Sequence, residues 1–149
     1  MAELTHFDNN GNAHMVDISE KQISFRIAKA ACSVHMSLET LKIISDGSAK
    51  KGDVLSVARI AGIQGAKRTS ELIPLCHPIS LTKVNLDLIL NEKLPGIEII
   101  ATAKTNGPTG VEMEALTAAG VSALTVYDMV KSLDKSLIIK NLRLILKDG

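Results

Sequence analysis

The chain has 149 residues and a formal net charge of +1 at pH 7. This length suits a single domain over residues 1–149 with a core of useful size. Hydrophobic residues make up 46% of the sequence but aromatic residues only 2%, so the core must be built from aliphatic side chains and alanine. The weak net charge argues against a nucleic acid or a membrane surface as partner, and the scarcity of rings argues against a stacking platform for single-stranded nucleic acid.

The two cysteines, Cys32 and Cys76, lie far apart in the sequence. They form neither a disulfide framework nor a zinc-finger spacing, and they suit a reducing cytosol. The N-terminus lacks a signal-peptide pattern, and the longest apolar run, residues 115–126, is too short to span a bilayer. We therefore expect a cytoplasmic protein without a membrane segment. No metal site is expected, because no group of His, Cys or carboxylate residues has ligand spacing.

The first 21 residues are polar, and we expect them to be partly flexible. Residues 22–36 then alternate between apolar and polar side chains, which predicts a long strand. The apolar phase changes midway, from odd positions at Ile23, Phe25 and Ile27 to even positions from Ala28 onward. This change predicts a β-bulge, or a strand whose two halves pack against different neighbours.

Two helices are expected next. The first has Ser37 as its N-cap and ends before Gly47. The second begins after Asp53 and carries apolar residues at helical spacing. Gly62 and Gly65 weaken this second helix, but they allow another backbone to approach it closely.

The remaining chain completes a sheet. Residues 84–90 and 97–103 alternate as two strands joined by a hairpin at 91–96, a long helix follows over 110–131, and a last strand covers 137–146. The order β-α-α-β-β-α-β predicts an α+β, ferredoxin-like fold, with an antiparallel sheet and helices on one face. Such a sheet leaves its other face bare, and we expect oligomerisation to cover it.

Residues 67–78, K-R-T-S-E-L-I-P-L-C-H-P, combine a basic helix end with a cysteine and a histidine between prolines. Because each proline disfavours helix in the residue before it, Cys76 and His77 are expected on a short extended segment. One interpretation is a helix exit with a structural cysteine. Another is a Cys-His enzyme, but neighbours on an extended segment point to opposite sides, so His77 is poorly placed to activate the thiol. Retention of activity by Cys76→Ser would dismiss that alternative.

Carboxylates gather at the start of the long helix. Thr109 and Glu112 have the spacing of a capping box, which would make Glu112 structural. A glycine-rich loop before a helix can also bind phosphate, but Glu112 and Glu114 would repel a polyphosphate there. Two carboxylates would suit the hydrogen-bond donor edge of a guanine- or pterin-like ring.

Asp128 and Lys131 share a face at the other end of this helix, and Lys135 extends the group. An ordinary surface ion pair is the simpler interpretation of that spacing, and Lys51 could equally lie in a solvated loop or bind phosphate. Glu114 and Asp128 are separated by about 21 Å along the helix, at ~1.5 Å per residue. If both ends are functional, one pocket must be shared between two subunits. A mixed oligomer of Lys51→Ala and Asp128→Ala subunits should then regain activity.

Seven stretches, in order along nearly the whole chain, resemble the MoaC family of cyclic pyranopterin monophosphate synthases, which act in molybdenum cofactor biosynthesis. They are A-H-M-V-D (13–17), K-G-D (51–53), A-R-I-A-G-I-Q (58–64), K-R-T (67–69), L-I-P-L-C-H-P (72–78), G-P-T-G-V-E-M-E-A-L-T (107–117) and A-L-T-V-Y-D-M-V-K (123–131). The strands and the turn at 91–96 carry no family signature.

The resemblance implies a ferredoxin-like subunit in a homohexamer, a trimer of dimers with active sites at the dimer interfaces. The implied enzyme is a lyase that converts 3′,8-cyclo-7,8-dihydro-GTP, supplied by a radical S-adenosylmethionine partner enzyme, into cyclic pyranopterin monophosphate and pyrophosphate. No cofactor is implied, and whether Mg²⁺ accompanies the triphosphate is left open.

The resemblance also implies residue roles. Asp128 becomes the catalytic acid/base, while Lys51 and Lys131 assist the chemistry or hold phosphates. The implied substrate contacts are Leu75, Cys76, His77, Glu112, Met113 and Glu114. These roles fit a reaction that needs proton transfers and neutralisation of phosphate charge. The alternative is a non-catalytic ferredoxin-like module that binds a nucleotide or pterin, and measuring pyrophosphate release from the cyclised GTP would separate the two.

Overall fold

The computed structural model describes residues 4–149 as an antiparallel sheet with four helices. The elements are β1 (Ser24–His35), α1 (Leu38–Ser45), α2 (Val54–Lys67), α3 (Thr69–Leu72), β2 (Leu81–Asn91), β3 (Gly96–Gly107), α4 (Glu112–Val130) and β4 (Ile138–Asp148). The predicted α+β, ferredoxin-like fold is confirmed. The short helix α3, inside the proline-flanked segment, is the one element that the sequence pattern did not predict.

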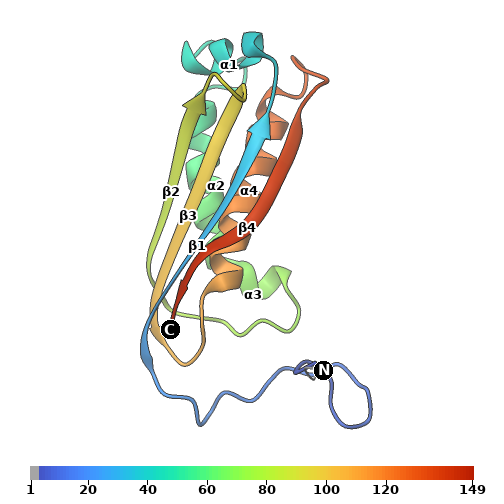
Figure 1. Cartoon of the computed structure of the whole chain (residues 1–149), viewed down its shortest axis with the longest axis vertical. Coiled ribbons are helices and arrows are strands. Elements are labelled where there is room, and N and C mark those ends of the chain that lie inside the picture. The colour runs from blue at the N-terminus through green and yellow to red at the C-terminus, as the bar shows by residue number, and fades with distance from the viewer. Residues whose placement is uncertain (1–3) are drawn as a thin grey trace.

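The sheet has the strand order β2-β3-β1-β4, so β2 and β4 are its edges. The long helices α2 and α4 lie together on one face, while α1 and α3 lie toward opposite ends of the molecule (Figure 1). In the described chain no helix lies over the opposite face of the sheet (Figure 1). Its coverage by another subunit stays a prediction.

The irregularity predicted in the middle of the first strand is confirmed. β1 pairs with β3 in an unbroken register, from Ser24 opposite Gly107 to His35 opposite Gly96. Its pairing with β4 instead shifts twice, between Lys29 and Ala30 and again between Ala31 and Ser33. Both shifts come just after the phase change between Ile27 and Ala28, and they affect only the edge of β1 that pairs with β4.

Small side chains form the centre of the core. Four strand alanines and four α4 alanines have no exposed surface and belong to one cluster: Ala28, Ala30, Ala101, Ala103, Ala115, Ala118, Ala119 and Ala123. Larger aliphatic side chains such as Leu86, Ile97 and Ile99 fill the surrounding space. The expectation of an aliphatic core rich in alanine is confirmed.

Glycines bring α2 close to its neighbours. A Cβ atom at Gly62 would lie 2.8 Å from Cγ of Leu86 and 3.0 Å from the carbonyl oxygen of Ala118. A Cβ atom at Gly65 would lie 3.0 Å from Cβ of Val121. Both glycines therefore serve the close approach that the sequence suggested, and α2 packs directly on α4 and β2.

The segment before β1 lies on the outside of the molecule. Residues 4–23 contain no helix or strand apart from an isolated bridge between Phe7 and Ala13. The flexibility expected for residues 1–21 stays a prediction, and residues 1–3 lie outside the described part of the chain.

Within residues 4–149, no helix has both the length and the apolar character required to cross a membrane. The same residues contain no group of three or more His, Cys, Asp or Glu side chains arranged to hold a metal ion.

Substitution of Gly62 tests the helix packing. We expect Gly62→Ala to lower the free energy of unfolding by about 1–3 kcal/mol, because the new methyl group forces α2 away from Leu86 and α4. Gly120→Ala is the matched control, since its Cβ would meet Cδ2 of Leu142 at an ordinary 3.6 Å. There we expect a gain of about 0.5–1 kcal/mol from helix propensity. Urea unfolding followed by circular dichroism measures both, and effects of equal sign would contradict the packing argument.

Candidate active site

The functional candidates form two groups at opposite ends of α4. Glu112, Met113 and Glu114 begin the helix, whereas Asp128 and Lys131 lie at its other end. The 14 residues from Glu114 to Asp128 span about 21 Å along the axis. In one chain the two groups are therefore separate sites.

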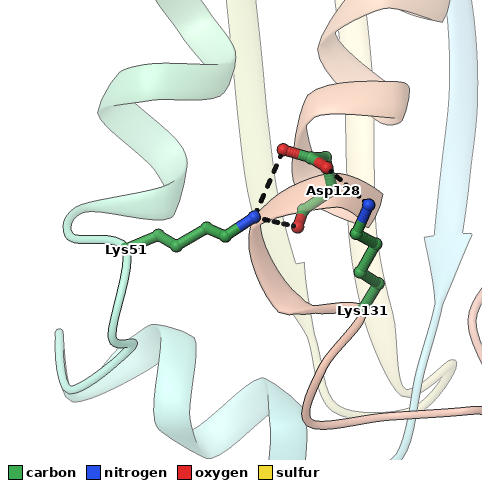
Figure 2. Close-up of polar contacts among 3 residues, drawn as sticks. All are labelled: Lys51, Asp128 and Lys131. Carbon is green, nitrogen blue, oxygen red and sulfur yellow. Dashed lines mark hydrogen bonds and ion pairs between the residues drawn. The ribbon is translucent and has the colours of Figure 1, made fainter.

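At the C-terminal end, two lysines hold one carboxylate (Figure 2). Nζ of Lys131 lies 3.0 Å from Oδ1 of Asp128, and Nζ of Lys51 lies 3.5 Å from Oδ2. Lys51 also donates a hydrogen bond of 3.1 Å to the carbonyl oxygen of Asp128. The hydrogen bond from Lys131, with the charges of both lysines, holds the pKa of Asp128 below its ordinary value. Asp128 is therefore ionised at neutral pH and able to accept a proton.

The turn between α1 and α2 positions Lys51. Gly52 takes a φ of +103°, which glycine adopts without steric cost, and its N–H donates to the carbonyl oxygen of Ala49 at 3.1 Å. Asp53 then caps α2 by accepting a hydrogen bond of 3.1 Å from the N–H of Ser56. The predicted cap at Asp53 is confirmed, and so is the cap of α1 by Ser37, whose side chain accepts from the N–H of Thr40.

Asp134 anchors the chain just after Lys131. Its carboxylate is buried and accepts hydrogen bonds from the N–H of Ser37 at 2.9 Å and of Ser136 at 2.7 Å. Burial raises the pKa of this carboxyl, but the hydrogen bonds outweigh burial and hold the pKa well below its usual range. Asp134 thus ties the turn after α4 to the start of α1. Sequence reasoning missed it, although Asp followed two residues later by Ser is a known turn pattern.

At the N-terminal end, a cavity of about 480 Å³ opens between α4 and the proline-flanked segment. Its lining includes all six predicted substrate contacts: Leu75, Cys76, His77, Glu112, Met113 and Glu114. Sequence reasoning missed His6, which also lines the cavity from the N-terminal segment. No lysine or arginine of the described chain is among the lining residues.

A buried acid and a thiol face each other in this cavity. Glu114 is 3% exposed, and Sγ of Cys76 lies 3.8 Å from its Oε2. Burial raises the pKa of Glu114, with a smaller contribution in the same direction from the charge of Glu112. Burial and the nearby Glu114 charge raise the pKa of Cys76 to about 11. A thiol that holds its proton so firmly is a poor nucleophile, which weighs against the Cys-His alternative.

The capping box predicted from Thr109 and Glu112 is wrong. Val111 is the N-cap of α4, without a side-chain hydrogen bond, so Glu112 is the first helical residue. A capping box needs its carboxylate two residues further into the helix, from where it can reach back to the cap. Glu112 instead pairs with Lys147 of β4, with Oε1 3.0 Å from Nζ.

The segment around Cys76 differs in part from the prediction. It leaves α3 through a turn in which the N–H of Cys76 donates to the carbonyl oxygen of Ile73 at 3.1 Å. Only the residues from Cys76 onward lack helix and turn structure, as expected between the two prolines. Cys76 Sγ lies 3.8 Å from the carbonyl oxygen of His77, and no hydrogen bond joins the thiol to the imidazole in the described chain.

The ferredoxin-like fold presents an acidic cavity at one end of its long helix and a lysine-carboxylate cluster at the other. These are the parts of an acid/base enzyme for a charged small molecule. Comparison with known families makes the assignment specific. The profile of the MoaC family matches residues 15–149. The chain belongs to the MoaC family.

Individual relatives cover the whole chain. The cyclic pyranopterin monophosphate synthase of Jannaschia sp. (strain CCS1) is 59% identical over 149 residues, which is 100% of this chain and 91% of the relative. The synthase of the same name from Cereibacter sphaeroides (strain ATCC 17029 / ATH 2.4.9) is 58% identical, over 100% of this chain and 94% of the relative. That from Dinoroseobacter shibae (strain DSM 16493 / NCIMB 14021 / DFL 12) is 59% identical with the same coverage.

Burial of Glu114 makes stability depend on pH. Because its pKa is raised in the folded state, the unfolded chain releases this proton first, and stability is lost as pH rises above the ordinary value of 4.5. We expect Glu114→Gln to remove this loss. The stability of the variant relative to the wild type should therefore increase between pH 4 and pH 8. Each unit of pKa elevation corresponds to about 1.4 kcal/mol, or about 3–6 °C in Tm. Thermal melts across that range measure the effect, and parallel curves for the two proteins would contradict it.

Proposed function

We propose that the chain is an enzyme that catalyses the reaction for which its relatives are named. It would convert 3′,8-cyclo-7,8-dihydro-GTP into cyclic pyranopterin monophosphate with release of pyrophosphate, as a lyase of molybdenum cofactor biosynthesis. The observation that carries this proposal is identity of 58–59% over all 149 residues to proteins of that name. Its two free cysteines fit a reducing cytoplasm, where a radical S-adenosylmethionine enzyme would supply the substrate.

In this proposal the cluster at the end of α4 performs the proton transfers. Asp128 is ionised and takes a proton from the substrate, and a neighbouring ammonium of Lys51 or Lys131 can return one. Closing the cyclic phosphate forms a bond from a substrate hydroxyl oxygen to the α-phosphorus and breaks the bond from that phosphorus to the pyrophosphate oxygen. The hydroxyl proton leaves to a base, and the two lysines stabilise the charge that develops on the phosphate oxygens.

The cavity at the other end of α4 would hold the ring system. Its volume of about 480 Å³ is in the range of small-molecule sites. Glu112 and Glu114 accept hydrogen bonds from ring N–H and amino groups, and Leu75 and Met113 contact the ring faces. Cys76 and His77 form the remaining wall.

Because one chain holds these two groups about 21 Å apart, the proposed site needs two subunits. The cavity of one subunit would meet the cluster of Lys51, Asp128 and Lys131 from its partner. Exposed apolar side chains on the edge strand β4, among them Leu142 and Ile145, give a further reason to expect subunit contacts. A homohexamer built as a trimer of dimers would satisfy both requirements.

Turnover tests the catalytic roles. We expect Lys51→Ala and Asp128→Ala each to lower kcat for pyrophosphate release by about 10²-fold or more. Their Tm should change little, because both side chains are about half exposed. Lys42→Ala is the control, an exposed lysine of α1 without an ion pair in the described chain. A variant whose Tm falls in proportion to its activity would point to a structural role for the residue. A wild-type protein that binds the cyclised GTP without releasing pyrophosphate would favour the non-catalytic module.

Mixed oligomers test the shared site, but the pair first expected from the sequence needs correction. Lys51 and Asp128 contact each other within one chain, so subunits carrying Lys51→Ala and Asp128→Ala damage the same half of the site. The informative pair is His77→Ala with Asp128→Ala, one from each end. Random mixing of two inactive parents in equal amounts should restore up to about a quarter of wild-type activity, from hetero-pairs with one intact site. A mixture as inactive as its parents would contradict sharing.

A further inference from the structure

The proposed site is short of positive charge. A triphosphate brings several negative charges, and proteins hold such groups with lysine, arginine and backbone N–H donors. The cavity at the start of α4 contributes Glu112 and Glu114 to its lining but no lysine or arginine. The cluster at the other end contributes Lys51 and Lys131, and both pair with Asp128. Lys147 stands beside the first cavity but pairs with Glu112. Further cations would therefore help to hold the phosphate chain.

A second cavity, of about 360 Å³, adjoins the first. Lys67 from the end of α2 and Lys83 from β2 line it together with Thr82. Ile79 lines both cavities, so the two lie against the same side chain. A ligand whose ring occupies the first cavity could therefore extend its phosphate chain into the second.

The lysines of this groove lie close to other positive charges. Lys83 stands directly opposite Lys104 in the pairing of β2 with β3, and facing like charges destabilise a sheet. Lys83 also lines a third cavity of about 220 Å³, with Lys29, Lys104 and a single carboxylate, Asp87. The ion pairs found in residues 4–149 involve none of these three lysines, nor Lys67. A bound anion would offset the repulsion.

The local backbone adds donors to the same place. The register of β2 against β3 shifts between Leu81 and Lys83, which leaves Thr82 without a partner in the ladder. Because β2 is an edge strand, its outer N–H groups are not used by the sheet. Ammonium, hydroxyl and N–H groups together are the donors that a phosphate chain requires.

We infer that Lys67, Thr82 and Lys83 form a subsite for a phosphate chain. It takes the triphosphate of the substrate, and after the reaction it holds the pyrophosphate. Lys29 and Lys104 strengthen the positive potential behind it without direct contact. This inference rests on the proposed function for the identity of the ligand, but the groove itself can be tested without turnover.

Inorganic pyrophosphate is the probe, titrated calorimetrically into the full-length protein. We expect Lys67→Ala and Lys83→Ala each to weaken binding about tenfold or more, as for a lost charge-assisted hydrogen bond. Lys67→Arg and Lys83→Arg should bind pyrophosphate with a Kd within a few-fold of that of the wild type. Lys93→Ala, an exposed lysine in the β2–β3 turn, is the matched control and should bind as wild type does. Melting curves check that each variant is folded.

Steady-state kinetics test whether the phosphates that the groove binds are those of the substrate. We expect the alanine variants to raise KM for the cyclised GTP about tenfold while kcat changes only a few-fold, since the groove binds and does not react. A wild type that does not bind pyrophosphate, or alanine variants that bind it normally, would overturn the subsite. Weakened pyrophosphate binding with an unchanged KM would overturn its assignment to the substrate. A wild type without turnover would contradict the proposed function. The pyrophosphate titration would still show whether the groove binds a phosphate chain.

Discussion

Close packing between small side chains is the constraint on which this structure depends. Alanines from the two central strands and from α4 meet without exposed surface, and glycines in α2 let that helix approach α4 and β2. With few aromatic rings, the chain has no large side chain with which to compensate for a displaced helix. Stability therefore requires α2 and α4 to sit close to the sheet, and a methyl group at Gly62 would already exceed the available space.

The fixed position of α4 organises the candidate site. The helix carries carboxylates in its first turn and Asp128 near its last, so its length sets the distance between a cavity and a charged cluster. Two anchors hold the cluster in place: the turn before α2 directs Lys51 toward Asp128, and Asp134 ties the chain after Lys131 to the start of α1. A rigid helix cannot bring its own ends together, so a site that uses both ends needs a second copy of the chain. Oligomerisation would then be a requirement of the chemistry as well as a means of covering the sheet.

Most of the fold could be predicted from the sequence because alternation and helical spacing are local signals. The bulged strand, the caps at Ser37 and Asp53 and the close approach at Gly62 all follow from residues near in sequence. The false capping box at Thr109 failed because the helix starts two residues later, which changes what Glu112 can reach. The four-residue helix α3 is too short to show a period. The contact of Lys51 with Asp128 and the groove of Lys67 with Lys83 join residues on different elements, which periodicity cannot bring together.

The charges at the start of α4 also bear on how a substrate would be oriented. The N-terminus of a helix normally attracts phosphate, through its free N–H groups and its dipole. Here Glu112 and Glu114 occupy that position, and Glu114 is buried next to Cys76. An anionic chain entering the cavity would meet carboxylates, whereas a ring edge rich in N–H donors would meet acceptors. Repulsion would thus exclude the reversed orientation, and the phosphates would be left to the lysine-lined groove beyond Ile79 and to the lysines of the partner subunit.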